Sequence, residues 1–224
     1  MEKTEVIVLY SFPYKDKKFM LEAYSKQHGR MTFTTNRKLQ PLSIVEITYE
    51  GIRTRAVSVE PAYIFRDLNN DPYKISIGFF IAEFLRYTTR NEPANTHLYE
   101  YIKQAVIWLD MSNESFANFH LVFTVRLTLF IGISPDVESY REGSIFDMRE
   151  ARFVTVHPNH SDVLSPSDSK KTAMLMRMSF ATMHLFRLSH GERNAAIDRI
   201  IQYYRLHIYD FPRMKSLDVL RELF

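Results

Sequence analysis

Basic residues at the predicted turns of the first quarter of the chain are the side chains best suited to bind a polyanion. Residues 1–60 contain 10 Lys and Arg against 7 Asp and Glu, whereas residues 61–224 contain 19 of each. The net charge of +3 therefore comes entirely from the first 60 residues. Lysine and arginine neutralise backbone phosphates, and aromatic rings between them stack on unpaired bases. The candidates for contact with DNA are Lys15, Lys17, Lys18, Arg30, Arg37, Lys38, Arg53 and Arg55.

These turn positions also permit a purely structural interpretation. Exposed turns are commonly basic because they are solvated, and lysine protects strand edges from pairing with other chains. On spacing alone, the two interpretations are equally supported.

A single arginine lies near the middle of the longest apolar stretch, which runs from Phe116 to Ile133. At the centre of a bilayer helix, Arg126 would cost about 2.5–3.5 kcal/mol, so we predict a buried helix of a globular fold. A buried guanidinium needs an anion or access to water. The internal carboxylates of Glu83 and Asp110 are the safer candidates, and the alternative is the carboxylate of a partner peptide.

The sequence contains few residue patterns that are typical of an enzyme active site. The absence of cysteine excludes disulfides, thiolate catalysis and thiolate metal sites, and six scattered glycines cannot form a phosphate-binding loop. His157, His160 and Asp162 are conceivable ligands of a hydrolytic metal, but Pro158 prevents the helical spacing that such ligands use. We therefore expect an exposed polar loop there, no cofactor, and no enzymatic activity.

Five short segments with β-branched and aromatic residues precede Asp71 and position the basic turns. Their number and spacing predict a small Greek-key barrel of the oligonucleotide-binding (OB) type. A barrel of this size is marginally stable alone, so we expect contacts with the rest of the chain to stabilise it. The predicted strands cover residues 4–12, 19–24, 31–35, 42–49 and 56–65.

After Asp71 the apolar residues recur at helical spacing. Asp71 and Pro72 form a typical helix start, and Ser189 with Glu192 forms a capping box. Between Ser134 and Ser165 the pattern fails, which predicts an irregular insert with a possible hairpin at 152–156. The predicted helices cover residues 71–90, 94–111, 116–133, 165–188, 189–208 and 216–224.

Several segments, in the right order along nearly the whole chain, resemble the bacterial RecO family of recombination mediators. The resemblance lies in short motifs of the barrel, the helices and the last part of the chain. These motifs are Tyr14-Lys15-Asp16-Lys17, Gln27-His28-Gly29-Arg30, Gln40-Pro41-Leu42, Asp71-Pro72-Tyr73-Lys74, Ala82-Glu83-Phe84-Leu85, Phe116-Ala117-Asn118-Phe119-His120, Met183-His184-Leu185-Phe186-Arg187-Leu188-Ser189 and the stretch from Phe211 to Leu220.

The resemblance implies a non-catalytic DNA repair protein that binds single- and double-stranded DNA and anneals complementary strands. It also implies two protein partners: RecR, and the acidic C-terminal tail of single-stranded-DNA-binding protein, which ends in an apolar residue. With RecR, such proteins help to load RecA onto coated single strands at gaps. An apolar pocket bearing an arginine suits that tail, so we expect Phe119, Phe123 and Arg126 to form the partner-peptide pocket.

The chain departs from the family pattern in two places. Many RecO proteins carry a four-cysteine zinc finger where this chain has residues 134–165, and without cysteine that zinc site cannot form. We expect packing of Ile145, Phe146, Phe153 and Val154 to hold the insert instead. The basic loop after the third strand is also short, with only Arg37 and Lys38, which leaves DNA affinity in question.

The sequence thus predicts an α+β protein with two domains and no cofactor. An OB-fold domain is expected over residues 1–68 and an all-helical domain over residues 69–224, with the insert at 134–165. No signal peptide is visible after Met1, and a cytoplasmic location is expected. The main alternative is a protein-interaction adaptor with weak DNA binding, and the less favoured one is the metal-dependent hydrolase.

Overall fold

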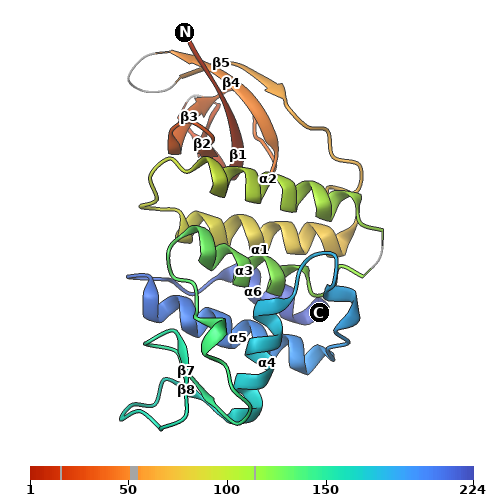
Figure 1. The fold of residues 1–224 in the computed structure, drawn as a ribbon. Helices are drawn as coiled ribbons and strands as arrows, with labels where there is room; N and C mark the ends of the chain where they lie inside the picture. The colour runs from red at the N-terminus through yellow and green to blue at the C-terminus, as the bar shows by residue number, and fades with distance from the viewer. Residues whose placement is uncertain (16, 51–54, 114) are drawn as a thin grey trace. The chain divides into compact units, whose positions relative to one another are not determined.

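Alternating apolar residues close the first five strands into a barrel. The computed structural model describes residues 1–15, 17–50, 55–113 and 115–224. The strands pair in the order β1-β2-β3-β5-β4, and β4 pairs with β1 to close the ring, which confirms the predicted OB-type barrel (Figure 1). They are β1 (Glu2–Tyr14), β2 (Lys18–Ser25), β3 (Gly29–Thr35), β4 (Ile44–Glu50) and β5 (Arg55–Pro61).

The interior of the barrel is filled by side chains that alternate along each strand. Each of these residues is at most 5% exposed, so the barrel is a packed core without a central channel. Its members are Val6, Val8, Leu21, Ala23, Phe33, Val45, Ile47 and Tyr49.

Three helices belong to the same compact unit as the barrel. This unit comprises Met1–Ser112 together with Arg213–Leu223. It contains α1 (Pro72–Thr88), α2 (Thr96–Met111) and α6 (Lys215–Leu223). Asp71 caps α1 as predicted, because its carboxylate accepts the backbone N–H groups of Tyr73 and Lys74.

The second compact unit comprises Asn113–Pro212 and Phe224. It contains α3 (Phe119–Phe130), α4 (Pro166–Arg177) and α5 (His190–His207), with short 3-10 helices at Val137–Ser139 and Met183–Leu185. The predicted change from strands to helices near residue 68 matches the secondary structure, but compactness groups α1 and α2 with the barrel. A domain boundary at residue 68 therefore stays a prediction.

The insert is held by a small antiparallel sheet with the order β7-β6-β8. Its strands are β6 (Ile145–Asp147), β7 (Arg152–Val154) and β8 (Val163–Leu164). Ile145 pairs with Val154, and Phe146 pairs with Phe153 at a ring-centroid distance of 4.8 Å. The four residues expected to pack in the insert thus form its central pairs.

The fourth helix is shorter than predicted. It ends at Arg177 instead of continuing to residue 188. Ser179 and Thr182 exchange side-chain to backbone hydrogen bonds that compete with helical ones. Further along, the side-chain amide of Asn118 donates to the carbonyls of Met183 and Phe186, on either side of a short 3-10 helix, and fixes a path that is not α-helical.

Across the described part of the chain, every helix is too short or too polar to span a bilayer.

Candidate functional site

Strand pairing brings three of the basic segments to the same part of the barrel. Tyr14 pairs with Lys18 across the β1–β2 turn, and Phe19 pairs with Thr35 at the end of β3. Thr34 in turn pairs with Arg55, the first residue of β5. We call the five exposed cations of these segments the basic tip: Lys15, Lys17, Lys18, Lys38 and Arg55.

The turn between β1 and β2 closes through a left-handed residue. The amide of Lys18 donates to the carbonyl of Lys15 at 3.1 Å, and Lys17 has φ of 61°. An L-residue other than asparagine or glycine is disfavoured at this angle. The presence of lysine there costs local stability and holds a third cation at the turn.

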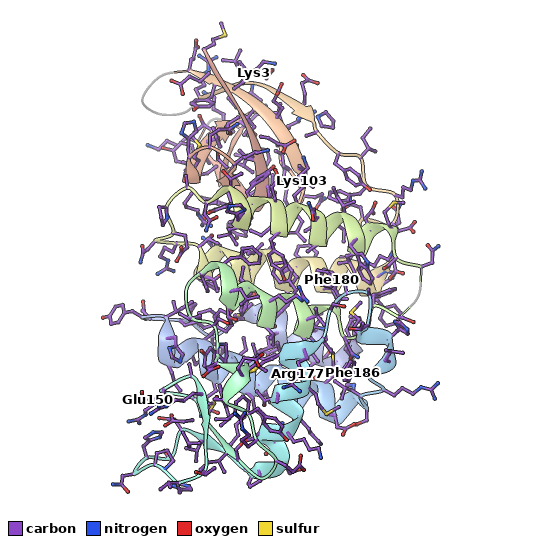
Figure 2. The ribbon with its side chains drawn as sticks, in the orientation of Figure 1. Lys3, Lys103, Glu150, Arg177, Phe180 and Phe186 are labelled. Atoms are coloured by element: carbon purple, nitrogen blue, oxygen red, sulfur yellow. The ribbon has the colours of Figure 1, made fainter. Side chains whose placement is uncertain are left out.

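The charge of the basic tip is not compensated within the described residues 1–15, 17–50 and 55–112, where none of its five cations forms an ion pair. Several cations elsewhere in this unit are paired with carboxylates. Lys3 lies 2.8 Å from Glu46, and Lys103 lies 2.8 Å from Glu5 (both lysines are labelled in Figure 2). The tip therefore gathers five exposed cations on one part of the barrel.

Arg30, one of the predicted DNA contacts, is paired with a carboxylate of the barrel. Its guanidinium is mostly buried and binds the carboxylate of Glu22, which also accepts two hydrogen bonds from Arg86 of α1 at 2.8 and 2.7 Å. Burial raises the pKa of Glu22, but the hydrogen bonds and charges of the two arginines outweigh burial and lower it overall. Arg30 is thus committed to the contact between the barrel and α1 and is a poor candidate for binding phosphate.

Arg37 is exposed, and its guanidinium donates one hydrogen bond to the carbonyl of Val59. A guanidinium has five N–H donors, so this hydrogen bond orients Arg37 and leaves donors for a phosphate. Arg53, the remaining candidate, lies outside the described residues.

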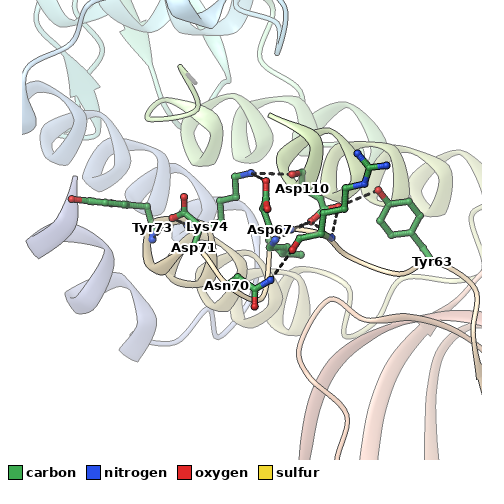
Figure 3. Close-up of polar contacts among 9 residues, drawn as sticks. Tyr63, Asp67, Asn70, Asp71, Tyr73, Lys74 and Asp110 are labelled. Atoms are coloured by element: carbon green, nitrogen blue, oxygen red, sulfur yellow. Dashed lines mark hydrogen bonds and ion pairs between the residues drawn. The ribbon is translucent and has the colours of Figure 1, made fainter. Parts of the chain in front are cut away.

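A buried carboxylate fixes the segment that leads from the barrel into α1 (Figure 3). Asp110 of α2 is 0% exposed and accepts the backbone N–H groups of Arg66, Asp67 and Leu68, and the hydroxyl of Tyr63. Burial raises the pKa of Asp110, but these four donors outweigh burial and lower it. Asp110 therefore serves as an internal anchor.

Neither of the internal carboxylates considered for Arg126 is the group that holds it. Asp110 is the anchor just described, and Glu83 accepts the backbone N–H groups of Lys215 and Ser216. The Nε of Arg126 donates instead to the carbonyl of Met178 at 3.1 Å. A carbonyl carries no net charge, and no carboxylate among the described residues forms an ion pair with Arg126.

The second unit contains an apolar cavity of about 180 Å³. Its walls come from α3, α4, α5 and the small sheet. Phe186, which is labelled in Figure 2, is also a lining residue. Methionine is prominent, which gives an adaptable surface. The lining residues include Val125, Met174, Met176, Met178, Ala195 and Arg199.

The expected peptide pocket is only partly in place. Phe119 and Phe123 are 0% exposed, pack against each other with ring centroids 6.0 Å apart, and do not line the cavity. They belong to the core, because the apolar stretch is buried on nearly all sides. Arg126 lies beside the cavity, since it holds Met178, which is a lining residue. The methionines of α4 were not predicted as part of a site, because their spacing is also that of an ordinary buried helix face.

The residues of the metal hypothesis do not converge. His160 lies 3.3 Å from Asp147, Asp162 binds Arg149 at 2.6 Å, and Nδ1 of His157 lies 2.7 Å from the carbonyl oxygen of Pro158. Among the residues with a described placement, no three histidine or acidic side chains are grouped to hold a metal. The geometry therefore gives the hydrolase alternative no support.

Comparisons with known proteins give matches along the whole chain. A family model described as "Recombination protein O C terminal" matches residues 69–218. A protein of Phocaeicola vulgatus named DNA repair protein RecO is 42% identical over 239 aligned positions, which cover 100% of this chain and 99% of that protein. Proteins with the same name from Bacteroides fragilis and Azobacteroides pseudotrichonymphae are 39% and 32% identical over 100% and 99% of this chain, and 99% and 98% of their own lengths.

Proposed function

Because the chain belongs to the RecO family of DNA repair proteins, we propose that it acts as a recombination mediator without catalysing a reaction. In this role it binds and anneals DNA strands, engages the tail of single-stranded-DNA-binding protein, and acts with RecR to load RecA at gaps. Annealing needs no active site, because base pairing supplies the driving force. The protein has only to neutralise two polyanions so that they approach each other.

The basic tip, whose five exposed cations form no ion pair within the described part of the chain, is the observation that supports DNA binding most strongly. Its five cations occupy turns and strand ends of an OB-type barrel, where such folds commonly bind nucleic acid. Paired lysines such as Lys3 would have to give up a carboxylate to bind phosphate, whereas the tip cations have no such partner among the residues with a described placement.

Neutralising Arg37, Lys38 and Arg55 with glutamine is expected to flatten the salt dependence of single-strand binding. Each cation that no longer neutralises a phosphate reduces the slope of log K against log salt by about 0.7 for a single strand. Neutralising all three should therefore reduce the slope by about 2. Fluorescence anisotropy with a labelled oligonucleotide between about 50 and 200 mM salt measures this change.

The control for this variant is Lys3→Gln, which removes a cation that is already paired and should leave the slope nearly unchanged. Equal slopes for the triple variant and the wild-type protein would remove these three residues from the site.

The apolar cavity of the second unit is the proposed site for the tail of single-stranded-DNA-binding protein. The terminal apolar side chain of the tail would enter between Met174, Met178 and Ala195, and Arg126 lies next to Met178 to receive its carboxylate. Arg199, another lining residue, is already paired with Asp168 at 2.6 Å, so Arg126 is the better candidate for the peptide carboxylate. A buried apolar anchor with a paired carboxylate suits this geometry.

Filling the cavity with Ala195→Leu is expected to weaken capture of a labelled tail peptide at least ten-fold. The added methylenes occupy the space of the peptide's apolar anchor, whose burial stabilises a complex by about 1.5–3 kcal/mol. Anisotropy of the labelled peptide measures the loss, and thermal unfolding of the free protein should be little changed.

The matched control is Ala181→Leu, the same change at an exposed position that does not line the cavity. Arg126→Ala should also abolish capture while the fold stays intact. If Ala195→Leu binds the peptide as well as Ala181→Leu does, the tail does not use this cavity.

A further inference from the structure

The outward face of β1 carries three aromatic residues that lead to the basic tip. The register between β1 and β2 shifts between Val8 and Tyr10, and Ser11 then pairs with Leu21, whose side chain is in the barrel core. Since side chains alternate along a strand, Tyr10, Phe12 and Tyr14 lie on the opposite, outward face. We call these three residues the aromatic strip.

Two of the three aromatic side chains of the strip are exposed to solvent. Tyr10 is 42% exposed and Tyr14 is 44% exposed, whereas every residue of the barrel core is at most 5% exposed. Tyr10 and Phe12, which is half-buried, stack on each other with ring centroids 5.5 Å apart and an interplanar angle of 29°. These neighbouring rings form an apolar surface on the outside of the barrel that a ligand can contact.

The inner end of the strip is held rigidly. The guanidinium of Arg86 lies 4.3 Å from the ring centroid of Tyr10, and its orientation is fixed by two hydrogen bonds to Glu22. Tyr10 pairs with Glu22 in the sheet, so the ring, the carboxylate and the guanidinium form one anchored group. The ring stack therefore needs little reorganisation when a ligand arrives.

The outer end of the strip meets the basic tip. Tyr14 pairs with Lys18, and Lys15 is the next residue along the chain. A ligand bound along the strip would therefore contact the flat apolar rings with one group and the positive charges of Lys15 and Lys18 with the adjacent group. Unpaired nucleotides have this alternation of base and phosphate, whereas the bases of a duplex are covered by stacking on their neighbours.

We propose that the aromatic strip is a base-stacking platform that makes the barrel prefer single-stranded DNA to duplex. Phosphates on either side of the stacked bases bind Lys15, Lys17 and Lys18, and the bases lie against Phe12 and Tyr14. The charge of the tip supplies affinity for any DNA, and the rings supply the preference between strand forms. This inference rests on the proposed DNA binding and adds its selectivity.

The test compares Phe12→Leu with Tyr14→Leu, each of which keeps apolar bulk and removes the ring. Binding of a labelled oligo-dT and of a duplex of equal length is measured at several salt concentrations. Each variant is expected to bind the single strand about ten-fold more weakly, with unchanged duplex affinity and an unchanged salt slope. Tyr14→Phe should bind as the wild-type protein does, because it keeps the ring.

Tyr209→Leu is the matched control, since Tyr209 is 99% exposed and lies in the second unit. Unchanged single-strand affinity in both ring variants, or equal losses on single strand and duplex, would overturn the platform while leaving DNA binding in place. Failure of the wild-type protein to bind either form would overturn the proposed function itself. Circular dichroism of each variant separates loss of stacking from loss of fold.

Discussion

Replacing Lys15, Lys17 and Lys18 together with glutamate is expected to lower the affinity for single-stranded DNA about 10³-fold at low salt. The change removes three cations that neutralise phosphates and brings three negative charges against the DNA backbone, which repels them. Strand annealing should fall in parallel, because it depends on the same neutralisation. Anisotropy and a fluorescence-quenching assay with complementary strands measure the two effects.

The control for this reversal changes net charge equally at a different place. Arg152, Arg187 and Arg205 are exposed arginines of the second unit, and their joint replacement with glutamate gives the same change in net charge. A comparable loss of affinity in this control variant would mean that overall charge, and not the basic tip, determines binding. Lys17→Asn is a useful single variant, since asparagine tolerates the left-handed angle of that residue.

Asp110→Ala is expected to lower the free energy of unfolding by about 3 kcal/mol. The change leaves three backbone N–H groups and the hydroxyl of Tyr63 without their acceptor inside the protein. It also frees the segment that joins the barrel to α1. Urea unfolding followed by circular dichroism measures the loss, and equal stability of the variant and the wild-type protein would contradict the anchoring role.

The same residue should make stability depend on pH. The pKa of Asp110 is lowered in the fold, so its stabilisation is fully present above the unfolded value of about 3.9 and is lost as pH falls toward the lowered folded value. Asp110→Asn cannot titrate and should show a flatter profile below about pH 4. Glu5 and Glu22 also have lowered pKa values, so the difference between the two proteins, and not the whole slope, reports on Asp110.

Local patterns were sufficient to predict the barrel and most helices. Alternation along the five strands and the caps at Asp71 and Ser189 act within a few residues, so they can be read without knowing the fold. The same patterns did not predict where α4 ends, because Asn118, which lies far away in the sequence, holds the chain after Met178 in a path that is not α-helical. Contacts over long sequence distances override helical periodicity there.

The surroundings of the candidate site residues could not be read from the sequence. Arg30 resembles the tip cations in sequence, and only the structure shows that Glu22 neutralises it. Phe119 and Phe123 have the right chemistry for a peptide pocket but lie in the core, while other residues of the same unit line the cavity. Burial and ion pairing depend on tertiary neighbours, which residue type and spacing do not reveal.

Annealing of complementary strands coated with single-stranded-DNA-binding protein tests the central claim most directly. The wild-type chain should accelerate annealing of both bare and coated strands, and the variant with glutamate at Lys15, Lys17 and Lys18 should accelerate neither. Ala195→Leu should keep its activity on bare strands and lose it on coated ones. No acceleration by the wild-type chain, with tight capture of the tail peptide, would contradict the claim and favour an adaptor that does not act on DNA.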